Sequence, residues 1–315
     1  MPSRPRRLRE NAWTEVKWEE ARPIIVPNDS RVGRCVLHPA NGVGKTSILF
    51  AMHHSRILRR SAVALASVAV RAHAQSAPPA REPIVTDRPD FTEATDAVGA
   101  HTFQLEAGNT FARTGDERSN ALGEVLLRVG LARRVELRVS PNSYVRTSPA
   151  TRAAGVPSAA GIEDASLGAK LALRTAPNGF APAVAVLVGT SVPTGSRAFR
   201  HAAPEREAKL ALSWELGERW DVATNVNYTA STEDDGTHVG EPAASVSVGH
   251  ELTARVGSYF EVYGFRPRGG EGTQYVNTGL TFQLSPDFQL DARVGSGVGG
   301  NAHDYFGGLG LARRW

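Results

Sequence analysis

The chain has a single cysteine, Cys35, among its 315 residues. One thiol forms no intramolecular disulfide and no thiolate metal cluster, so a disulfide scaffold and a cysteine-rich metal fold are excluded. No run of about 18 or more apolar residues occurs, which excludes a membrane-spanning helix. The histidines are scattered, without the H-x-x-x-H spacing of a zinc site, so we predict no metal and no cofactor.

The excess of positive over negative charge is also small. The formal net charge is only +4, and much of the excess arginine lies in the first sixty residues, as in PSRPRRLRE. A basic surface spread over a folded domain is the electrostatic signature of nucleic-acid binding. Because the excess here is small and terminal, we predict no nucleic-acid partner.

One segment, HPANGVGKTSILF at residues 38–50, contains most of a nucleotide-binding loop. The motif G-x-x-x-x-G-K-[ST] wraps phosphates with backbone amides, and Gly44, Lys45 and Thr46 match its second half. Pro39 stands where the first glycine belongs, which removes an N–H donor and restricts φ. A P-loop nucleotide-binding protein is therefore a remote alternative.

A secretory signal follows directly. Residues 52–74 begin with Met52, continue through an arginine-rich head and a short apolar core, and end in Ala72-His73-Ala74, a small-x-small cleavage pattern. We therefore expect translation to start at Met52 and the chain to be exported. Residues 1–51 are then predicted to be a wrongly assigned, disordered extension.

From residue 101 onward, apolar and polar side chains alternate with the period of two that is typical of β-strands. In HTFQLEAGNTFA, Phe103 and Leu105 lie on one face, and Gln104 and Glu106 lie on the other. About twelve such segments occur, each roughly ten residues long, the length that a tilted strand needs to cross a bilayer. Their predicted bounds are 101–112, 120–131, 134–145, 163–174, 181–192, 207–217, 220–230, 243–253, 256–266, 274–284, 287–297 and 304–315.

The links between these segments alternate strictly between long and short. RTGDERS and RTSPATRAAGVPSAAGIED are long and polar, whereas ARR, GER, TAR and SPD are short. Outer-membrane barrels have this layout, with tight periplasmic turns and longer extracellular loops, and only a closed sheet pairs every backbone group in lipid. We predict an all-β fold in which residues 101–315 form a closed antiparallel transmembrane β-barrel of about 12 strands.

The alternation also divides the charged residues from the apolar ones. The apolar face of each strand is predicted to meet lipid, and the charged residues to line the lumen, where their mixed signs favour salt bridges over a strongly selective ion filter. The lumen-facing charged candidates are Glu106, Glu124, Arg128, Glu136, Arg138, Lys170, Lys209, Glu215, Asp291 and Arg293.

Several stretches between about Ile84 and Trp315 form a recognisable pattern: IVTDRPDFTEATDAV, LGEVLLRVGLARRVELRV, EDASLGAKLAL, GTSVPTGS, KLALSWELGERWDVATNVNY and SPDFQLDARVGSG. In these stretches the chain resembles the outer-membrane family named for the MetA pathway of phenol degradation, whose members are often called transporters. The resemblance implies a Gram-negative outer-membrane barrel that passes or binds small solutes, hydrophobic or aromatic ones among them. It supplies no catalytic residues.

Two further features concern the ends of the barrel. Residues 75–100 contain TDRPDFTE, whose charged side chains would either form a partial plug against the lumen or stay solvated as a periplasmic lead-in; the candidates are Asp87, Arg88, Asp90 and Glu93. The last strand ends in an aromatic residue, Trp315. This ending resembles the signal that the barrel-assembly machinery recognises, so we expect that machinery and outer-membrane lipid as partners.

An enzymatic alternative uses the same barrel. Outer-membrane acyl hydrolases need a serine–histidine pair facing lipid, and His250 and Ser258 lie on neighbouring predicted strands. A histidine in the interface belt beside a short turn explains His250 as well. We therefore predict a channel or binding barrel for small solutes, and no enzyme.

Overall fold

The computed structural model describes residues 81–149, 158–175, 180–232, 236–266, 271–299 and 302–315, and these residues are folded almost entirely into strands. The candidate nucleotide loop and the candidate signal peptide lie outside the described residues. No helix among the described residues is long and apolar enough to cross a membrane. The strands are β1 Phe103–Thr114, β2 Glu117–Leu122, β3 Leu126–Ala132, β4 Val135–Ser140, β5 Tyr144–Pro149, β6 Ala159–Ile162, β7 Ala165–Arg174, β8 Ala183–Val192, β9 Arg206–Glu215, β10 Trp220–Thr232, β11 His238–Thr253, β12 Val256–Phe265, β13 Thr273–Ser285, β14 Phe288–Gly299 and β15 Tyr305–Arg314.

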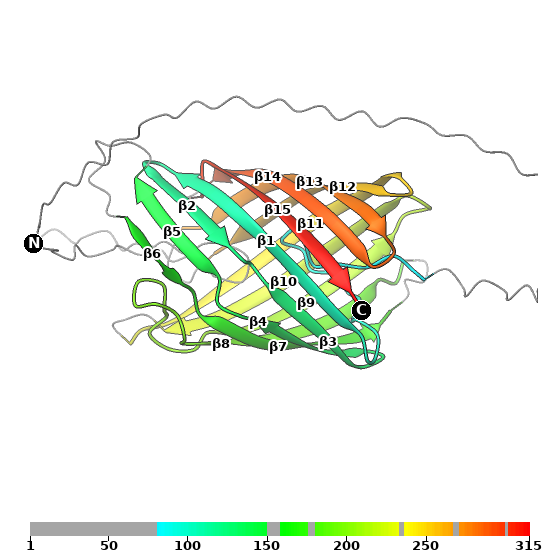
Figure 1. Cartoon of the computed structure of the whole chain (residues 1–315), viewed down its shortest axis with the longest axis horizontal. Helices are drawn as coiled ribbons and strands as arrows, with labels where there is room; N and C mark the ends of the chain where they lie inside the picture. The colour runs from blue at the N-terminus through cyan, green and yellow to red at the C-terminus, as the bar shows by residue number, and fades with distance from the viewer. Residues whose placement is uncertain (1–80, 150–157, 176–179, 233–235, 267–270, 300–301) are drawn as a thin grey trace, which may run out of the picture. The chain divides into compact units, whose positions relative to one another are not determined.

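The strands form one antiparallel sheet that closes on itself (Figure 1). From β7 to β15 each strand pairs with the next along the chain, and the last strand, β15, pairs with β1 from Gln104↔Arg314 to Arg113↔Tyr305. Trp315 extends this seam, since its N–H donates to the carbonyl of Phe103 at 2.9 Å. Closure leaves no unpaired sheet edge along this seam, as a bilayer requires.

Three of the barrel strands are each interrupted once. β2 and β3 both pair with β1, so they are two halves of one barrel strand. β5 pairs with β2 and β4 pairs with β3, which makes β4 and β5 the halves of the next strand. β6 pairs with β5 and β7 pairs with β4, which makes β6 and β7 the halves of the third. Residues 123–125, 141–143 and 163–164 separate the halves. When each interrupted pair is counted once, the barrel has 12 strands, which confirms the predicted fold class. The breaks themselves are not encoded in the alternation, because side chains still alternate on either side of them.

One predicted long loop is wrong. Residues 113–119 form a tight hairpin in which Thr114 pairs with Glu117 and only Gly115 and Asp116 lie between the strands. Gly115 has φ of +55°, a conformation that glycine adopts without steric cost. Strands also extend into other predicted loops, so that β11 already begins at His238 and β14 runs to Gly299. Polar composition concealed these extensions, because strand ends beyond the lipid need not be apolar on either face.

The barrel buries polar side chains and exposes apolar ones. Fully buried side chains include Arg128, Lys170, Glu106, Glu136 and Glu261. Leucine, valine and aromatic side chains dominate the outer face, such as Leu309 at 64% exposure and Val226 at 56%. This distribution is the reverse of a water-soluble protein and is what a lipid-facing wall around a polar lumen requires.

Candidate functional site: a charged lumen around an inserted plug

Residues 81–102 precede β1, and we call this segment the plug; its ends lie at the rim, and its buried part, from Ile84 to Val98, lies in the lumen. It contacts inward side chains of strands distributed around the whole barrel, from Glu106 of β1 and Lys170 of β7 to Glu261 of β12 and Arg293 of β14. Only a segment inside the barrel can touch all of these strands. Of the two expectations for residues 75–100, the described part therefore has the arrangement of a plug.

Asp87 is the centre of the charged cluster. Its carboxylate pairs with Lys170 Nζ at 2.9 Å, with Arg138 Nη1 at 2.5 Å and with Arg128 Nη1 at 3.4 Å. Its N–H donates to the Glu106 carboxylate at 3.0 Å. Cations from three different strands thus converge on one acidic residue of the plug.

Arg128 connects the plug to the wall. Its Nε is 3.0 Å from Glu136 Oε1 and its Nη1 is 3.0 Å from Glu106 Oε1. The same guanidinium donates to the backbone carbonyls of Val85 and Asp96 at 3.2 and 2.7 Å. A buried arginine with a full set of acceptors is electrostatically compensated and rigidly placed.

Glu93 is a second plug carboxylate that pairs with cations of the wall. One carboxylate oxygen is 2.6 Å from Lys209 Nζ, and the other is 2.9 Å from Arg138 Nη2. Arg138 therefore bridges Asp87 and Glu93, and Lys209 also pairs with Glu207 at 2.9 Å. These contacts form a continuous chain of opposite charges across the lumen.

The guanidinium of Arg88 lies against β1, β14 and β15. It is 3.4 Å from both Glu124 and Asp291, and it passes over Gly108 and Gly310, which face each other across the β1–β15 pair. A Cβ at either glycine would overlap the guanidinium. The absence of two side chains thus creates the slot that Arg88 occupies.

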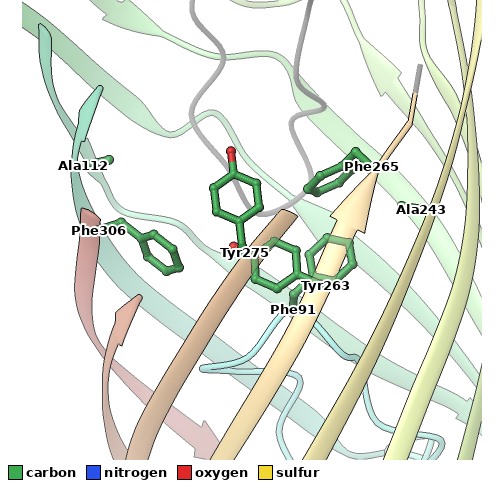
Figure 2. Packing of buried hydrophobic residues seen from close by; sticks show 7 residues of the cluster. All are labelled: Phe91, Ala112, Ala243, Tyr263, Phe265, Tyr275 and Phe306. Atoms are coloured by element: carbon green, nitrogen blue, oxygen red, sulfur yellow. The ribbon is translucent and has the colours of Figure 1, made fainter. Parts of the chain in front are cut away.

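An aromatic cluster holds the tip of the plug (Figure 2). Phe91 stacks on Tyr263 with ring centroids 4.6 Å apart, and Tyr263 stacks on Tyr275 at 5.0 Å. Phe265 contacts Phe91 edge-on at 5.2 Å. Glu261, on the same strand as Tyr263 and Phe265, accepts the N–H groups of Phe91 and Thr92 at 2.9 and 2.7 Å. The tip is therefore fixed by both ring packing and charge-assisted hydrogen bonds.

The plug carboxyls divide into two kinds. Burial acts to raise the pKa of Asp87, but Arg128, Lys170 and Arg138 outweigh burial and hold that pKa well below its usual value. Burial also acts to raise the pKa of Glu93, and Arg138 and Lys209 bring it below the usual value. By contrast, burial and the nearby Glu261 raise the pKa of Asp90 well above its usual value. Asp87 and Glu93 thus hold the plug as anions, whereas Asp90 favours its protonated form.

A cavity of about 160 Å³ lies beside the plug. Plug residues Asp87 to Asp90 and Glu93 line one side, and residues of β4, β7, β8 and β9 line the other. The lining combines apolar side chains such as Leu126, Leu187 and Phe199 with charged ones such as Arg138 and Lys209. The cavity is also lined by residues from each of the three strand breaks, such as Glu124, Pro141 and Asp164. The site is therefore a small amphipathic chamber within the barrel.

The structure brings together most of the sequence-derived candidates. Glu106, Glu124, Arg128, Glu136, Arg138, Lys170, Lys209, Asp291 and Arg293 all contact the plug. Glu215 does not: it is exposed at the end of β9, beside the short turn, and lies outside this network of described residues. Among the plug candidates, Asp87, Arg88 and Glu93 pair with wall charges, and Asp90 lines the cavity.

Glu261 and the aromatic cluster were not among the candidates. In β12, the residues Tyr259, Glu261, Tyr263 and Phe265 face inward and are buried, whereas Phe260 and Val262 face outward. Both faces of this strand are largely apolar, so hydrophobicity did not distinguish them. The alternation of tyrosine and glutamate on one face was the signal that could have identified the inward side.

His250 and Ser258 do not form a catalytic pair. They are register partners on β11 and β12, but Ser258 Oγ donates to the backbone carbonyl of His250 at 3.3 Å. The imidazole lies 3.2 Å from the carbonyl of Arg219 and stacks on Trp220 with centroids 3.9 Å apart. His250 is thus packed in an aromatic belt position. Within the described ranges, no group of three or more His, Cys, Asp or Glu side chains is arranged to hold a metal ion.

Comparison with known proteins agrees with this architecture. The model of the family described as "Putative MetA-pathway of phenol degradation" matches residues 86–315. No curated protein matches the sequence. The crystal structure of the COG4313 outer membrane channel from Pseudomonas putida F1 is similar, with a TM-score of 0.56 and 15% identity over 72% of this chain and 99% of that one. The NanC porin has a TM-score of 0.46 and 9% identity over 66% of this chain and 98% of its own.

Proposed function

We propose that this chain, which belongs to the family described as "Putative MetA-pathway of phenol degradation", is an outer-membrane channel for small solutes. The observation that carries the proposal is the amphipathic cavity between the plug and the barrel wall. A barrel built only as a membrane anchor needs no such chamber. The apolar outer face supports a location in the outer membrane, which the candidate signal peptide at residues 52–74 would allow the chain to reach.

The width of the lumen limits the size of the solute. Sixteen-stranded porins enclose an open aqueous channel, and a barrel of 12 strands is narrower. The plug fills much of the remaining space with hydrogen-bonded backbone and paired charges. A large unselective pore is therefore incompatible with this architecture, and the proposal is restricted to small molecules.

The lining favours solutes that have both an apolar body and a polar group. Leu126, Leu187 and Phe199 offer an apolar surface, and Arg138, Lys209 and Glu205 offer charge in the same chamber. Ligand sites of small molecules commonly combine a mainly apolar lining with a few polar groups. Small aromatic compounds with a hydroxyl or carboxyl group have this character, and the family description is consistent with them.

The experiment compares two substitutions on β7. Ser166 is 7% exposed and lines the cavity, whereas its neighbour Leu167 is 46% exposed on the lipid face. In liposomes containing the purified barrel, we expect uptake of a phenolsulfonate, a phenol whose permanent negative charge keeps it from crossing lipid unaided. We expect loss of that uptake with Ser166→Trp and normal uptake with Leu167→Trp. A tryptophan on the lipid face is a matched control for folding and bulk. If liposomes with and without the unsubstituted barrel take up phenolsulfonate and small ions equally, the channel function is wrong.

A further inference from the structure

In addition to the ion pairs of Asp87 and Arg88, three attachments hold the plug. The first is at the short-turn rim, where Asp287, between β13 and β14, pairs with Arg81 at 3.0 Å and with Arg314 at 2.8 Å. There the N–H of Ile84 also donates to the carbonyl of Pro286 at 2.8 Å. The N-terminal end of the plug is thus clasped to the rim through which it enters.

The second attachment is the tip of the plug, and the third is the segment that returns from the tip toward β1. The tip is held by Phe91 in the aromatic cluster and by Glu261. On the return, the N–H of Val98 donates to Glu136 at 2.8 Å, and Lys170 Nζ donates to the carbonyl of Ala94 at 2.9 Å. The backbone carbonyl of Gly99 packs so closely on Gly130 of β3 that a Cβ added to Gly130 would overlap that carbonyl. Removing the plug would break all three attachments and leave buried charges unpaired, which is strongly unfavourable.

The plug is nevertheless close-packed on only part of its circumference. On the side of β4, β7, β8 and β9 it faces the cavity, and Glu93, Arg138 and Lys209 are among the side chains that line this cavity. Glu93 reaches across to Lys209 and Arg138 at 2.6 and 2.9 Å. These ion pairs join side chains only, so they can part without movement of the plug backbone.

We infer that the plug stays seated while solutes pass, and that they travel along its cavity side past the ion pairs of Glu93 with Arg138 and Lys209. This inference rests on the proposed channel function and specifies its route. Glu93 then controls passage in addition to pairing the plug with the wall, whereas Phe91, Glu261 and Asp287 only hold the segment that carries it.

Two pairs of hydroxyl side chains allow the plug to be fixed covalently. Thr92 Oγ1 and Ser245 Oγ are 2.8 Å apart, and Thr95 Oγ1 and Ser213 Oγ are 3.0 Å apart. In each pair one residue belongs to the plug and the other to the wall, and side chains that point at each other suit a disulfide. The staples are Thr92→Cys with Ser245→Cys and Thr95→Cys with Ser213→Cys, each in the full chain with Cys35→Ser. The single-cysteine variants are the matched controls.

Planar-bilayer conductance of each double variant, oxidised and then reduced, tests the inference. We expect the oxidised barrels, with disulfides confirmed by mass and by loss of free thiols, to conduct as well as their reduced forms. Loss of conductance on oxidation that a reductant restores, and that the single-cysteine controls do not show, would overturn the inference while leaving the channel function intact. Absence of conductance in the unsubstituted barrel would instead contradict the channel function, and the route with it.

A second measurement assigns the controlling residue. In the oxidised Thr95–Ser213 staple background, Glu93→Ala is expected to raise the conductance, because it removes the carboxylate that joins the plug to Arg138 and Lys209 at the cavity while the disulfide prevents displacement of the plug. Thr92→Ala in the same background is the control, since Thr92 lies at the tip and outside the cavity lining. Equal conductance of the Glu93→Ala variant and its stapled parent would remove Glu93 from the route.

Discussion

At the scale of single residues, the lumen is organised by charges that are buried and paired. Arg128 contacts Asp87, Glu106 and Glu136, and it also binds two backbone carbonyls of the plug. Buried ion pairs contribute little net stability relative to an apolar replacement, but loss of one partner leaves the other charges uncompensated. The network therefore serves mainly to specify where the plug lies.

Arg128→Ala tests this role. It removes the cation that three carboxylates share, and we expect it to lower the free energy of unfolding by about 3–5 kcal/mol. Arg146, exposed on the outer face of β5, is the matched control, and Arg146→Ala should change stability by less than about 0.5 kcal/mol. Urea unfolding in detergent, followed by circular dichroism, measures both. Equal stability of the two variants would contradict the structural importance of the cluster.

At the scale of elements, the plug is a segment without regular secondary structure that the barrel wall holds in place. Its attachments are carboxylates on cations, and the pKa values of Asp87, Glu93 and Asp287 are all lowered, because cations outweigh the effect of burial. A group whose pKa is lower in the folded state stabilises that state at neutral pH. Its contribution is lost as the pH falls below the unfolded value.

Acid should therefore loosen the plug. As the pH falls below the ordinary values of 4.5 for Glu93 and 3.8 for Asp87, the stabilisation from both groups declines. The raised pKa of Asp90 has the opposite effect on stability as the pH falls, because its protonated form is favoured in the folded state. We expect the thermal unfolding temperature to fall between pH 5 and pH 3. In the variant Asp87→Asn with Glu93→Gln it should be lower at pH 7 and depend less on pH. Parallel pH profiles for both proteins would contradict this assignment.

At the scale of the whole barrel, closure depends on the last residues of the chain. β15 completes the wall against β1, and the backbone of Trp315 continues the pairing while its side chain remains 57% exposed. An exposed ring at the end of the closing strand is accessible before closure is complete. We propose that Trp315 serves assembly more than the stability of the finished barrel.

Trp315→Ala is expected to reduce the amount of folded barrel in the outer-membrane fraction of cells, measured as the band that shifts on heating in gel electrophoresis. Refolding of the same variant from urea into detergent micelles should be nearly normal. Trp220→Ala is the matched control, because Trp220 is 50% exposed at the short-turn end and lies far from the closing seam. Equal amounts of the two variants in cells would contradict a role of Trp315 in assembly.

The alternation of side chains was sufficient to predict the class of fold and the face of most charged residues. Glu106, Arg128, Lys170 and Asp291 each stand between outward apolar neighbours, and such a pattern is incompatible with any element except a strand between lipid and a polar interior. This information is local, since each residue needs only its own strand to define its side of the wall.

The partners of those charges depend on the closed barrel. Asp87 meets cations from β3, β4 and β7 because closure and register bring those strands around the plug, and no local pattern contains that distance. The strand breaks, the Phe91 cluster and the exposed position of Glu215 arise in the same way. Periodicity determines the side of the wall on which a residue lies, whereas contacts across the lumen require the curvature of the whole sheet.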